Sequence, residues 1–351
     1  MMKNWQSTLV SPDTPILKTI EVINQSALQV AMVVDKDRKL LGMVTDGDIR
    51  RAILDNHAMS TSVEKIMKVG CTVASIDKSH EDVLRLMKEF SLRHIPIVDH
   101  YGRVIDLKVL LDIVGQPQKR ENWVVLMAGG LGSRLLPLTE ECPKPLLKVG
   151  GRPLLETIIE NFKENEFYQF FISLNYKGEM IEEYFGDGSK FGVKIKYIRE
   201  EKKLGTVGAL HMLTDLPPQP IFVMNGDVLT KINLQQVLNF HLEQKATATM
   251  CVREYDFQVP FGVVKVEGNQ ILEIEEKPVH NFFVNAGIYV LEPSCLKNIP
   301  ENRCFNMTDL FEKLIRLNEK TVAFPIHEYW LDVGQLTDFR KANGEFQKIF
   351  K

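Results

Sequence analysis

The stretch that decides the fold of most of this chain is LMAGGLGSRLLPLTEECPKPLLKVGGRPLLE, residues 126–156. Three closely spaced glycines open it: Gly129, Gly130 and Gly132. Because glycine has no Cβ atom, such a loop can turn tightly and bring backbone N–H groups against phosphate oxygens. Arg134 and Lys144 add two cations nearby, the lysine between two prolines. The stretch therefore predicts a phosphate-binding loop after a strand.

Two common phosphate-binding patterns do not fit this loop. A dinucleotide-binding fold requires G-x-G-x-x-G and an acidic residue about 20 positions later. Here the spacing is G-G-x-G, and residues 149–152 read VGGR, without an acid. The Walker pattern G-x-x-x-x-G-K-[ST] is absent from the sequence. A purely structural alternative, a tight strand-to-helix turn, leaves Arg134 and Lys144 unexplained.

Around this loop, short apolar runs alternate with helix-like segments. The runs begin at Trp123, Phe170, Val193 and Ile221. Such alternation predicts βαβ crossovers and a largely parallel sheet. The later runs GVVKV and NAGIYVL, separated by shorter gaps, indicate added mixed or antiparallel pairing, and GQLTDFRKANGEFQKIF indicates a closing helix. We expect an α/β domain over residues 122–351.

Further motifs follow in order, VMNGDV with Asp227 and WLDVG with Asp332. Together with the loop they resemble the signature of the sugar-1-phosphate nucleotidyltransferases, across residues 122–351. The resemblance implies a Rossmann-like, GT-A-like mixed sheet that binds the nucleotide at the carboxyl ends of its strands. It implies catalytic roles for Arg134, Lys144, Asp227 and Asp332. The nucleotide-binding positions that it implies are Leu126, Ala128, Gly129, Gly130, Gly132, Ser133, Glu200, Gly205 and Thr206.

By the same resemblance, Asp227 and Asp332 hold Mg²⁺. This hard ion prefers one or two carboxylates together with substrate phosphates. An aspartate after a strand is also a common turn former or helix cap, so the alternative is a structural role.

The resemblance assigns a third group of residues to the sugar phosphate: Gly262, Glu276, Lys277, Asn285 and Gly287. Glu276 would accept hydrogen bonds from ring hydroxyls and Lys277 would pair with the phosphate. The alternative is a solvated charge run at a strand end.

By the same resemblance, the segment YIREEKKLGTVGAL contains the residues that recognise the nucleotide base. Thymidylyl- and uridylyltransferases of this type have a glutamine five residues before the glycine, and here Glu200 precedes Gly205. A carboxylate matches the two adjacent donors of guanine, which favours GTP; the alternative is a surface charge cluster. The overall arrangement resembles the glucosamine-1-phosphate guanylyltransferases of legionaminic acid pathways. A mannose- or glucose-1-phosphate nucleotidyltransferase using another nucleotide, and an inactive nucleotide-sensing scaffold, are the competing hypotheses.

The first 117 residues contain an internal repeat. A shift of 64 residues lays residues 33–49 over residues 97–113. Each copy has the pattern helix, strand, turn, strand, helix, and a helix after Ser79 is marked by Val83, Leu84, Met87 and Phe90 on one face. Two such copies should pack as one unit because neither can bury much alone.

The repeat resembles tandem CBS domains, a regulatory pair that often binds adenine nucleotides. GMVTDGD in the first copy matches the family motif, so Thr45 would bind a phosphate and Asp48 a ribose diol. The second copy has Asp106 and Val109 in place of glycine and threonine and keeps only Asp112. The alternative is a dimerisation scaffold without a ligand.

Composition sets the remaining expectations for this chain of 351 residues. A net charge of -3 argues against a nucleic-acid partner. There is no apolar run of membrane-spanning length, and the polar start lacks a signal peptide. Five cysteines without a C-x-x-C pair fit a reducing cytoplasm. We expect a cytoplasmic homo-oligomer with a CBS module over residues 1–117, a linker over 118–121 and a transferase domain over 122–351.

Overall fold

The computed structural model describes residues 4–26, 28–90, 92–110, 120–213 and 218–350. The chain forms two units, residues 1–118 and residues 119–351. None of the helices in the described ranges combines the length and the apolar character that a membrane span requires.

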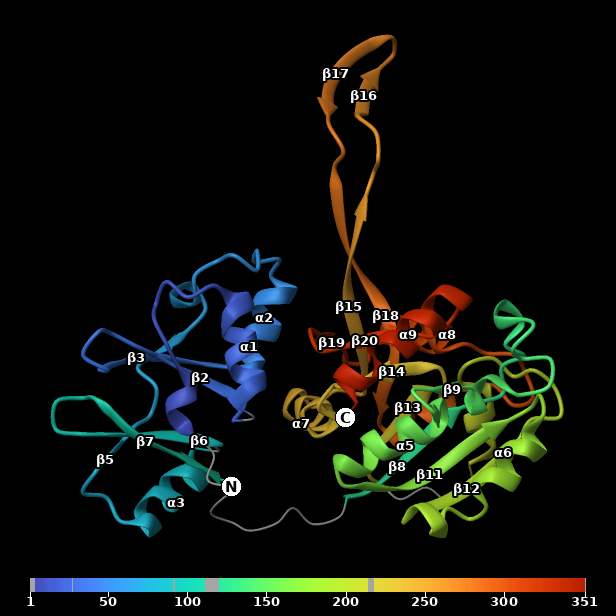
Figure 1. Cartoon of the computed structure of the whole chain (residues 1–351), viewed down its shortest axis with the longest axis horizontal. Helices are drawn as coiled ribbons and strands as arrows, with labels where there is room; N and C mark the ends of the chain where they lie inside the picture. The colour runs from blue at the N-terminus through green and yellow to red at the C-terminus, as the bar shows by residue number, and fades with distance from the viewer. Residues whose placement is uncertain (1–3, 27, 91, 111–119, 214–217, 351) are drawn as a thin grey trace. The chain divides into compact units, whose positions relative to one another are not determined.

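The first unit contains the expected repeat (Figure 1). The elements of the first copy are β1 (Leu9–Val10), α1 (Ile16–Ser26), β2 (Val30–Val34), β3 (Leu40–Thr45) and α2 (Asp46–Leu54). Those of the second copy are β5 (Ala74–Ser75), α3 (His80–Glu89), β6 (His94–Val98) and β7 (Val104–Val109). A short strand, β4 (Lys68–Val69), pairs with β3.

Strand register confirms the repeat residue by residue. In the first copy two register pairs are Val10↔Val33 and Val30↔Thr45. Adding 64 to each number gives two register pairs of the second copy, Ala74↔Ile97 and His94↔Val109. The copies share one apolar core in which strand β2 packs with Val104, Leu107 and Val109. They form one module, as the sequence predicted.

One expected core residue of this unit lies elsewhere. Val83 and Met87 are buried on α3, whereas Phe90 is 55% exposed. The helix ends at Glu89 and Phe90 is its C-cap, so its side chain leaves the buried face. Ser79 caps the helix as expected, because its hydroxyl accepts a hydrogen bond from the Asp82 N–H at 3.1 Å.

The second unit is built on a seven-stranded mixed sheet in the order β12-β11-β8-β13-β18-β15-β19. Its strands are β8 (Arg120–Met127), β11 (Phe167–Leu174), β12 (Lys194–Arg199), β13 (Ile221–Asn225), β15 (Ala248–Gln258), β18 (Val279–Leu291) and β19 (Thr321–Ile326). The first four strands in this order run parallel. Strand β18 is antiparallel to both neighbours. The sequence therefore predicted the class of the sheet correctly.

Helices cover both faces of this sheet because its central strands are apolar on both sides. On β8, Val124 and Leu126 belong to one core, and Trp123 and Val125 to the other. The first core is closed by α5 (Leu154–Glu164), α6 (Gly178–Phe185) and α7 (Leu234–Gln244). The second is closed by α8 (Met307–Arg316). Near the C-terminus, α9 (Leu336–Ile349) packs in a smaller core with Leu135 and Val149.

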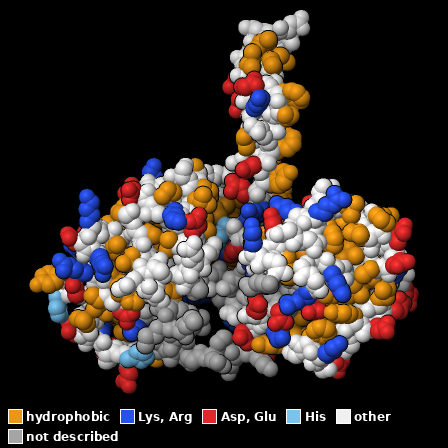
Figure 2. Space-filling view, viewed as in Figure 1, with side chains coloured by type: hydrophobic (Ala, Val, Ile, Leu, Met, Phe, Trp, Pro, Cys, Tyr) orange, Lys and Arg blue, Asp and Glu red, His pale blue; other side chains and the backbone are white. Residues whose placement is uncertain are grey.

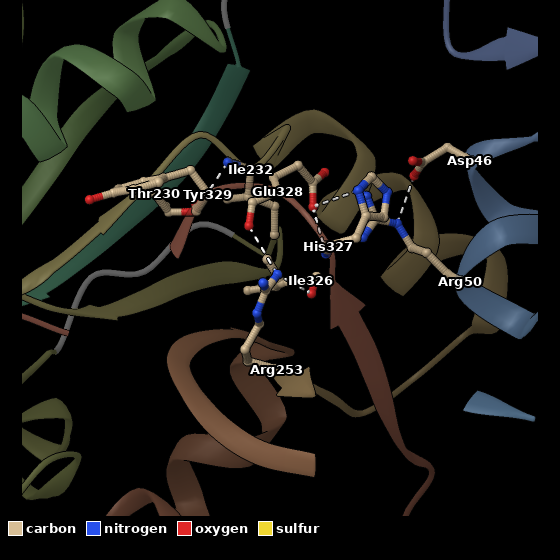
Figure 3. A network of polar contacts seen from close by, with 9 residues as sticks. All are labelled: Asp46, Arg50, Thr230, Ile232, Arg253, Ile326, His327, Glu328 and Tyr329. Atoms are coloured by element: carbon tan, nitrogen blue, oxygen red, sulfur yellow. Dashed lines mark hydrogen bonds and ion pairs between the residues drawn. The ribbon is translucent and has the colours of Figure 1, made fainter. Parts of the chain in front are cut away.

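A small two-stranded ladder follows the carboxyl end of β13. It pairs β14 (Val228–Thr230) with β20 (Trp330–Asp332) in antiparallel fashion. The segment that leads into β20 is fixed from two sides (Figure 3). Arg253 donates to the carbonyls of Ile326 and Glu328 at 3.0 and 3.1 Å, and the Thr230 hydroxyl donates to the Tyr329 carbonyl at 2.8 Å. These contacts hold Asp332 at a defined place beside β14.

Beyond the sheet, β15 and β18 continue as a two-stranded ribbon that ends in β16 (Val263–Glu267) and β17 (Gln270–Glu275) (Figure 1). We call residues 254–283 the arm.

Candidate functional site

Two acidic residues distant in the sequence meet at the β14–β20 ladder. Val228 is the register partner of Asp332, and the Val333 N–H donates to the Asp227 carbonyl at 3.0 Å. Asp332 is exposed when the whole residue is considered, but the surrounding protein partly desolvates its carboxyl group. That desolvation raises its pKa, and the negative charge of Asp227 raises it further. The two carboxylates therefore share one electrostatic environment.

Lys144 is the counter-ion of this pair. Its Nζ lies 2.5 Å from Oδ2 of Asp227, and the lysine side chain is only 10% exposed. The other carboxylate oxygen, Oδ1 of Asp227, is buried and has no hydrogen-bond partner among the described residues. A buried carboxylate oxygen without a partner is costly unless a ligand satisfies it. The donor set, two carboxylates with one oxygen free, suits a hard divalent cation.

Arg134 flanks the same centre from the glycine-rich loop. It lies in a single 3-10 turn, Ser133–Leu135, and is exposed. A Cβ atom built on Gly334 would lie 3.6 Å from both Nη1 of Arg134 and Oδ2 of Asp332. The guanidinium thus lies near the second carboxylate, and its charge opposes the rise in the pKa of Asp332.

The glycine-rich loop leaves the sheet directly after β8. Gly132 has φ of +66°, and a Cβ there would lie 2.8 Å from Thr139 and 3.3 Å from the Cβ of Lys144. Glycine is therefore required at this position to keep the loop against the segment that carries the lysine. Ser133 follows in the exposed turn, whereas Leu126 and Ala128 are buried in the sheet core.

Glu200 lies at the other side of this loop, after β12. Its Oε1 accepts from the Ser173 hydroxyl at 2.5 Å, and its Oε2 accepts from the Leu204 N–H at 3.1 Å. A Cβ on Gly129 would lie 3.2 Å from Oε1. The carboxylate is therefore held in a fixed orientation against the loop backbone.

Gly205 and Thr206 follow on the same segment. Gly205 packs against the Phe305 carbonyl, and Thr206 accepts a hydrogen bond from the Met307 N–H at 2.8 Å. These two residues join the Glu200 segment to the start of α8.

Comparisons with known proteins identify the family of both parts of the chain. Residues 123–349 match the family model of the nucleotidyl transferases, and residues 6–55 and 63–107 match that of the CBS domain. The chain belongs to the nucleotidyl transferase family. Its catalytic domain is a nucleotidyltransferase domain, and a CBS pair precedes it.

Relatives of this nucleotidyl transferase differ in the base and the sugar that their names give. A UTP–glucose-1-phosphate uridylyltransferase of Synechocystis is 30% identical over 238 residues, covering 62% of this chain and 61% of the relative. A mannose-1-phosphate guanylyltransferase of Mycobacterium tuberculosis is 32% identical over 228 residues, covering 63% of each. The chain thus spans about three fifths of the length of these relatives. The crystal structure of HddC from Yersinia pseudotuberculosis has 25% identity and a TM-score of 0.51, covering 64% of this chain and 99% of that chain.

Two of the residues expected at the sugar, Asn285 and Gly287, lie close to the Asp227–Asp332 pair of this nucleotidyl transferase. Asn285 on β18 accepts from the Gly287 N–H at 3.0 Å and from the Tyr289 hydroxyl at 2.8 Å. A Cβ on Gly287 would lie 2.7 Å from Nδ2 of Asn225, which is two residues before Asp227.

The other three, Gly262, Glu276 and Lys277, lie on the arm and are exposed. Between Asn285 and Val279 the ladder with β15 runs for six residues, about 20 Å at the usual rise of a strand. The structure therefore does not bring these three residues to the carboxylate pair of their own chain.

In the CBS pair, the two candidate nucleotide residues cap a helix. The Thr45 N–H and hydroxyl donate to Oδ2 of Asp48 at 2.8 and 2.6 Å, and Arg51 donates to Oδ1. This capping box gives both residues a structural task at the start of α2. Asp112, the third candidate, lies outside the described residues.

Sequence reasoning missed two residues of the catalytic domain. Asn225 belongs to VMNGDV and could have been found by its position beside Asp227. Ser173, which holds Glu200, is inside an apolar strand and carries no signal of its own.

Proposed function

We propose that this chain transfers a nucleotidyl group from a nucleoside triphosphate to a sugar 1-phosphate and releases pyrophosphate. The observation that carries the proposal is the convergence of Asp227 and Asp332 with Lys144 and Arg134, next to a glycine-rich loop at the carboxyl ends of parallel strands. Ligands of open α/β sheets bind at this edge. Membership of the nucleotidyl transferase family supports the same reaction class.

Mg²⁺ would be held by Asp227 and Asp332, together with phosphate oxygens of the substrates. The buried Oδ1 of Asp227, which has no hydrogen-bond partner in the parts of the chain that the structure describes, supports this assignment. When bound, the ion would neutralise the charge that grows on the α-phosphate and on the leaving pyrophosphate.

The residues of the chain then have to orient two anions that repel each other. The sugar phosphate is already a charged nucleophile at neutral pH, so no activated serine, cysteine or histidine is required. Backbone N–H groups of the glycine-rich loop and the guanidinium of Arg134 would position the triphosphate. Lys144, which pairs with Asp227, would turn its charge toward the phosphates. Asn285 and the backbone at Gly287 would contact the sugar beside this centre.

GTP is the proposed donor. Guanine offers two adjacent donors, N1–H and the exocyclic amine, and each oxygen of the Glu200 carboxylate keeps acceptor capacity beyond its one protein hydrogen bond. Its fixed orientation against Gly129 supports a role in base recognition. For the sugar we propose glucosamine 1-phosphate.

A second proposal concerns regulation. An adenine nucleotide would bind the CBS pair at Thr45 and Asp48, with Asp112 as the residue that the second copy retains. Binding would displace Arg51 from Asp48, because a ribose diol needs the same carboxylate oxygens. Calorimetric titration with AMP, ADP and ATP tests this. Wild-type protein should release or absorb heat and an Asp48→Ala variant should not; the same heat from both would reject the site.

The reaction is tested by pyrophosphate release with MgCl₂, crossing GTP, UTP, dTTP, ATP and CTP with glucosamine, glucose and mannose 1-phosphates. We expect the highest kcat/KM for GTP with glucosamine 1-phosphate. Release with another pair would keep the reaction class and reject the assigned donor or sugar. No release from any combination would reject the proposed function.

A further inference from the structure

The arm is a two-stranded extension of β15 and β18 that no third strand flanks among the described residues. Its proximal ladder runs from Glu254↔Phe283 to Gln258↔Val279, and its distal ladder pairs β16 with β17. A two-stranded ribbon has two unpaired edges and is marginally stable in water without a surface to pack on. The arm therefore needs a partner surface.

Apolar side chains cover the arm on both strands, and those on the visible face appear in Figure 2. Twelve large apolar residues are between 38% and 73% exposed: Tyr255, Phe257, Phe261, Val263, Val264, Val266, Ile271, Leu272, Ile274, Val279, Phe282 and Phe283. Together they leave on the order of 1,000 Å² of apolar surface, more than the largest patch of a typical monomer. Two arms engaged reciprocally would supply an interface of the standard size for stable complexes.

The charge of the arm indicates which kind of surface it fits. Residues 254–283 contain two lysines and six acidic residues, a formal charge of -4. An anionic lipid surface or a nucleic acid would repel this arm. The apolar and acidic character of the arm instead favours packing against the surface of a protein.

A polar junction interrupts this apolar ribbon between its two ladders. There a Cβ on Gly262 would lie 2.9 Å from Oε2 of Glu276, and Lys277 has φ of +49°. A lysine backbone in the left-handed region is strained, and on an exposed ribbon such strain is a sign of functional constraint. The junction contains Glu276 and Lys277, the residues expected at the sugar phosphate, about 20 Å along the ladder from Asn285.

We propose that the arm packs on a second copy of this chain and delivers Glu276 and Lys277 to the Asp227–Asp332 centre of that copy. The inference rests on the proposed function, because it assigns these residues to the sugar phosphate. Each centre, where Lys144 and Arg134 already accompany the two carboxylates, would receive one further cation and one carboxylate from the opposing junction. In a twofold dimer both exchanges occur together, so each site is complete only in the dimer.

Complementation between two inactive variants tests the exchange. Lys277→Ala removes the delivered cation but keeps the centre, and Asp227→Asn removes the centre but keeps the arm. Co-expressed with different tags, they should form mixed dimers with one intact site. Half of the dimers are mixed and each has one of two sites, so we expect about one quarter of wild-type activity. Asp227→Asn with Asp332→Asn is the matched control and should regain nothing.

The oligomeric state of the wild type in solution distinguishes a failure of the arm exchange from a failure of the proposed reaction. Sedimentation should give a dimer, and Phe261→Ser with Ile271→Ser should shift it toward monomer. A monomeric wild type, or a dimer whose mixed variants stay as inactive as the control, overturns the exchange. Failure of the wild type to turn over any substrate pair would reject the proposed function, and the mass of the arm variant would still decide whether the arm joins two copies.

Discussion

Replacement of Lys144 by methionine should make the catalytic domain depend on a divalent cation for its stability. The ion pair joins Nζ to Oδ2 of Asp227 at 2.5 Å, with the two side chains 10% and 27% exposed. Without the ammonium, Asp227 stays unpaired next to Asp332. Loss of one partner of a buried pair costs about 3–5 kcal/mol, and the partial exposure of Asp227 reduces this to roughly 2–3 kcal/mol. For a domain of this size the Tm should fall by about 5–10 °C in EDTA.

Saturating MgCl₂ should then raise the Tm of Lys144→Met more than that of the wild type. The cation replaces the lost positive charge and no longer competes with an ammonium for Asp227. Turnover should fall by about 10²–10³-fold, since a charge that stabilises the transition state is lost. Differential scanning calorimetry and a pyrophosphate assay measure both effects. Lys148→Met, which removes an exposed lysine of the same segment, is the control and should change neither.

A Lys144→Met protein as stable in EDTA as the wild type would refute the stabilising role of this ion pair. Equal Tm gains of the two proteins on addition of MgCl₂ would refute it as well.

Three further changes test other parts of the molecule. Gly129→Val should raise the KM for the nucleoside triphosphate at least about tenfold, because a Cβ there already lies 3.1 Å from Asn175 and 3.2 Å from Glu200; an unchanged KM would remove the loop from the binding site. Glu200→Gln should lower the ratio of kcat/KM for GTP over UTP by about tenfold or more, and an unaltered ratio would refute base recognition by this carboxylate. Burial lowers the pKa of His241, against the opposing charge of Glu292, so protonation opposes folding. The Tm should therefore fall as the pH drops below about 6.5, and less steeply in His241→Gln; parallel pH profiles would contradict this.

Much of the architecture follows from local patterns. The 64-residue shift predicted the internal repeat of the CBS pair, and the strands of the two copies pair in equivalent registers. The apolar runs predicted the parallel strands of the sheet, since strands covered on both faces are apolar throughout. Phe90 was misplaced because helical periodicity does not indicate where the helix ends.

The site could be predicted only in part. Asp227 follows β13 and Asp332 ends β20, so both lie at strand ends, as the sequence indicated. Their meeting depends on a pairing between β14 and β20 that no local signal reveals. Motif order also placed Glu276 with Asn285, whereas the β15–β18 ladder continues past the sheet and separates them. How far a ribbon extends depends on long-range pairing, which the periodicity of a single strand does not contain.

The most direct test of the carboxylate centre is the pyrophosphate release of Asp227→Ala and Asp332→Ala with the best substrate pair of the wild type. We expect each variant to keep a cooperative unfolding transition and to lose at least about 10²-fold in kcat. Near-normal turnover by a folded Asp227→Ala protein would contradict the account.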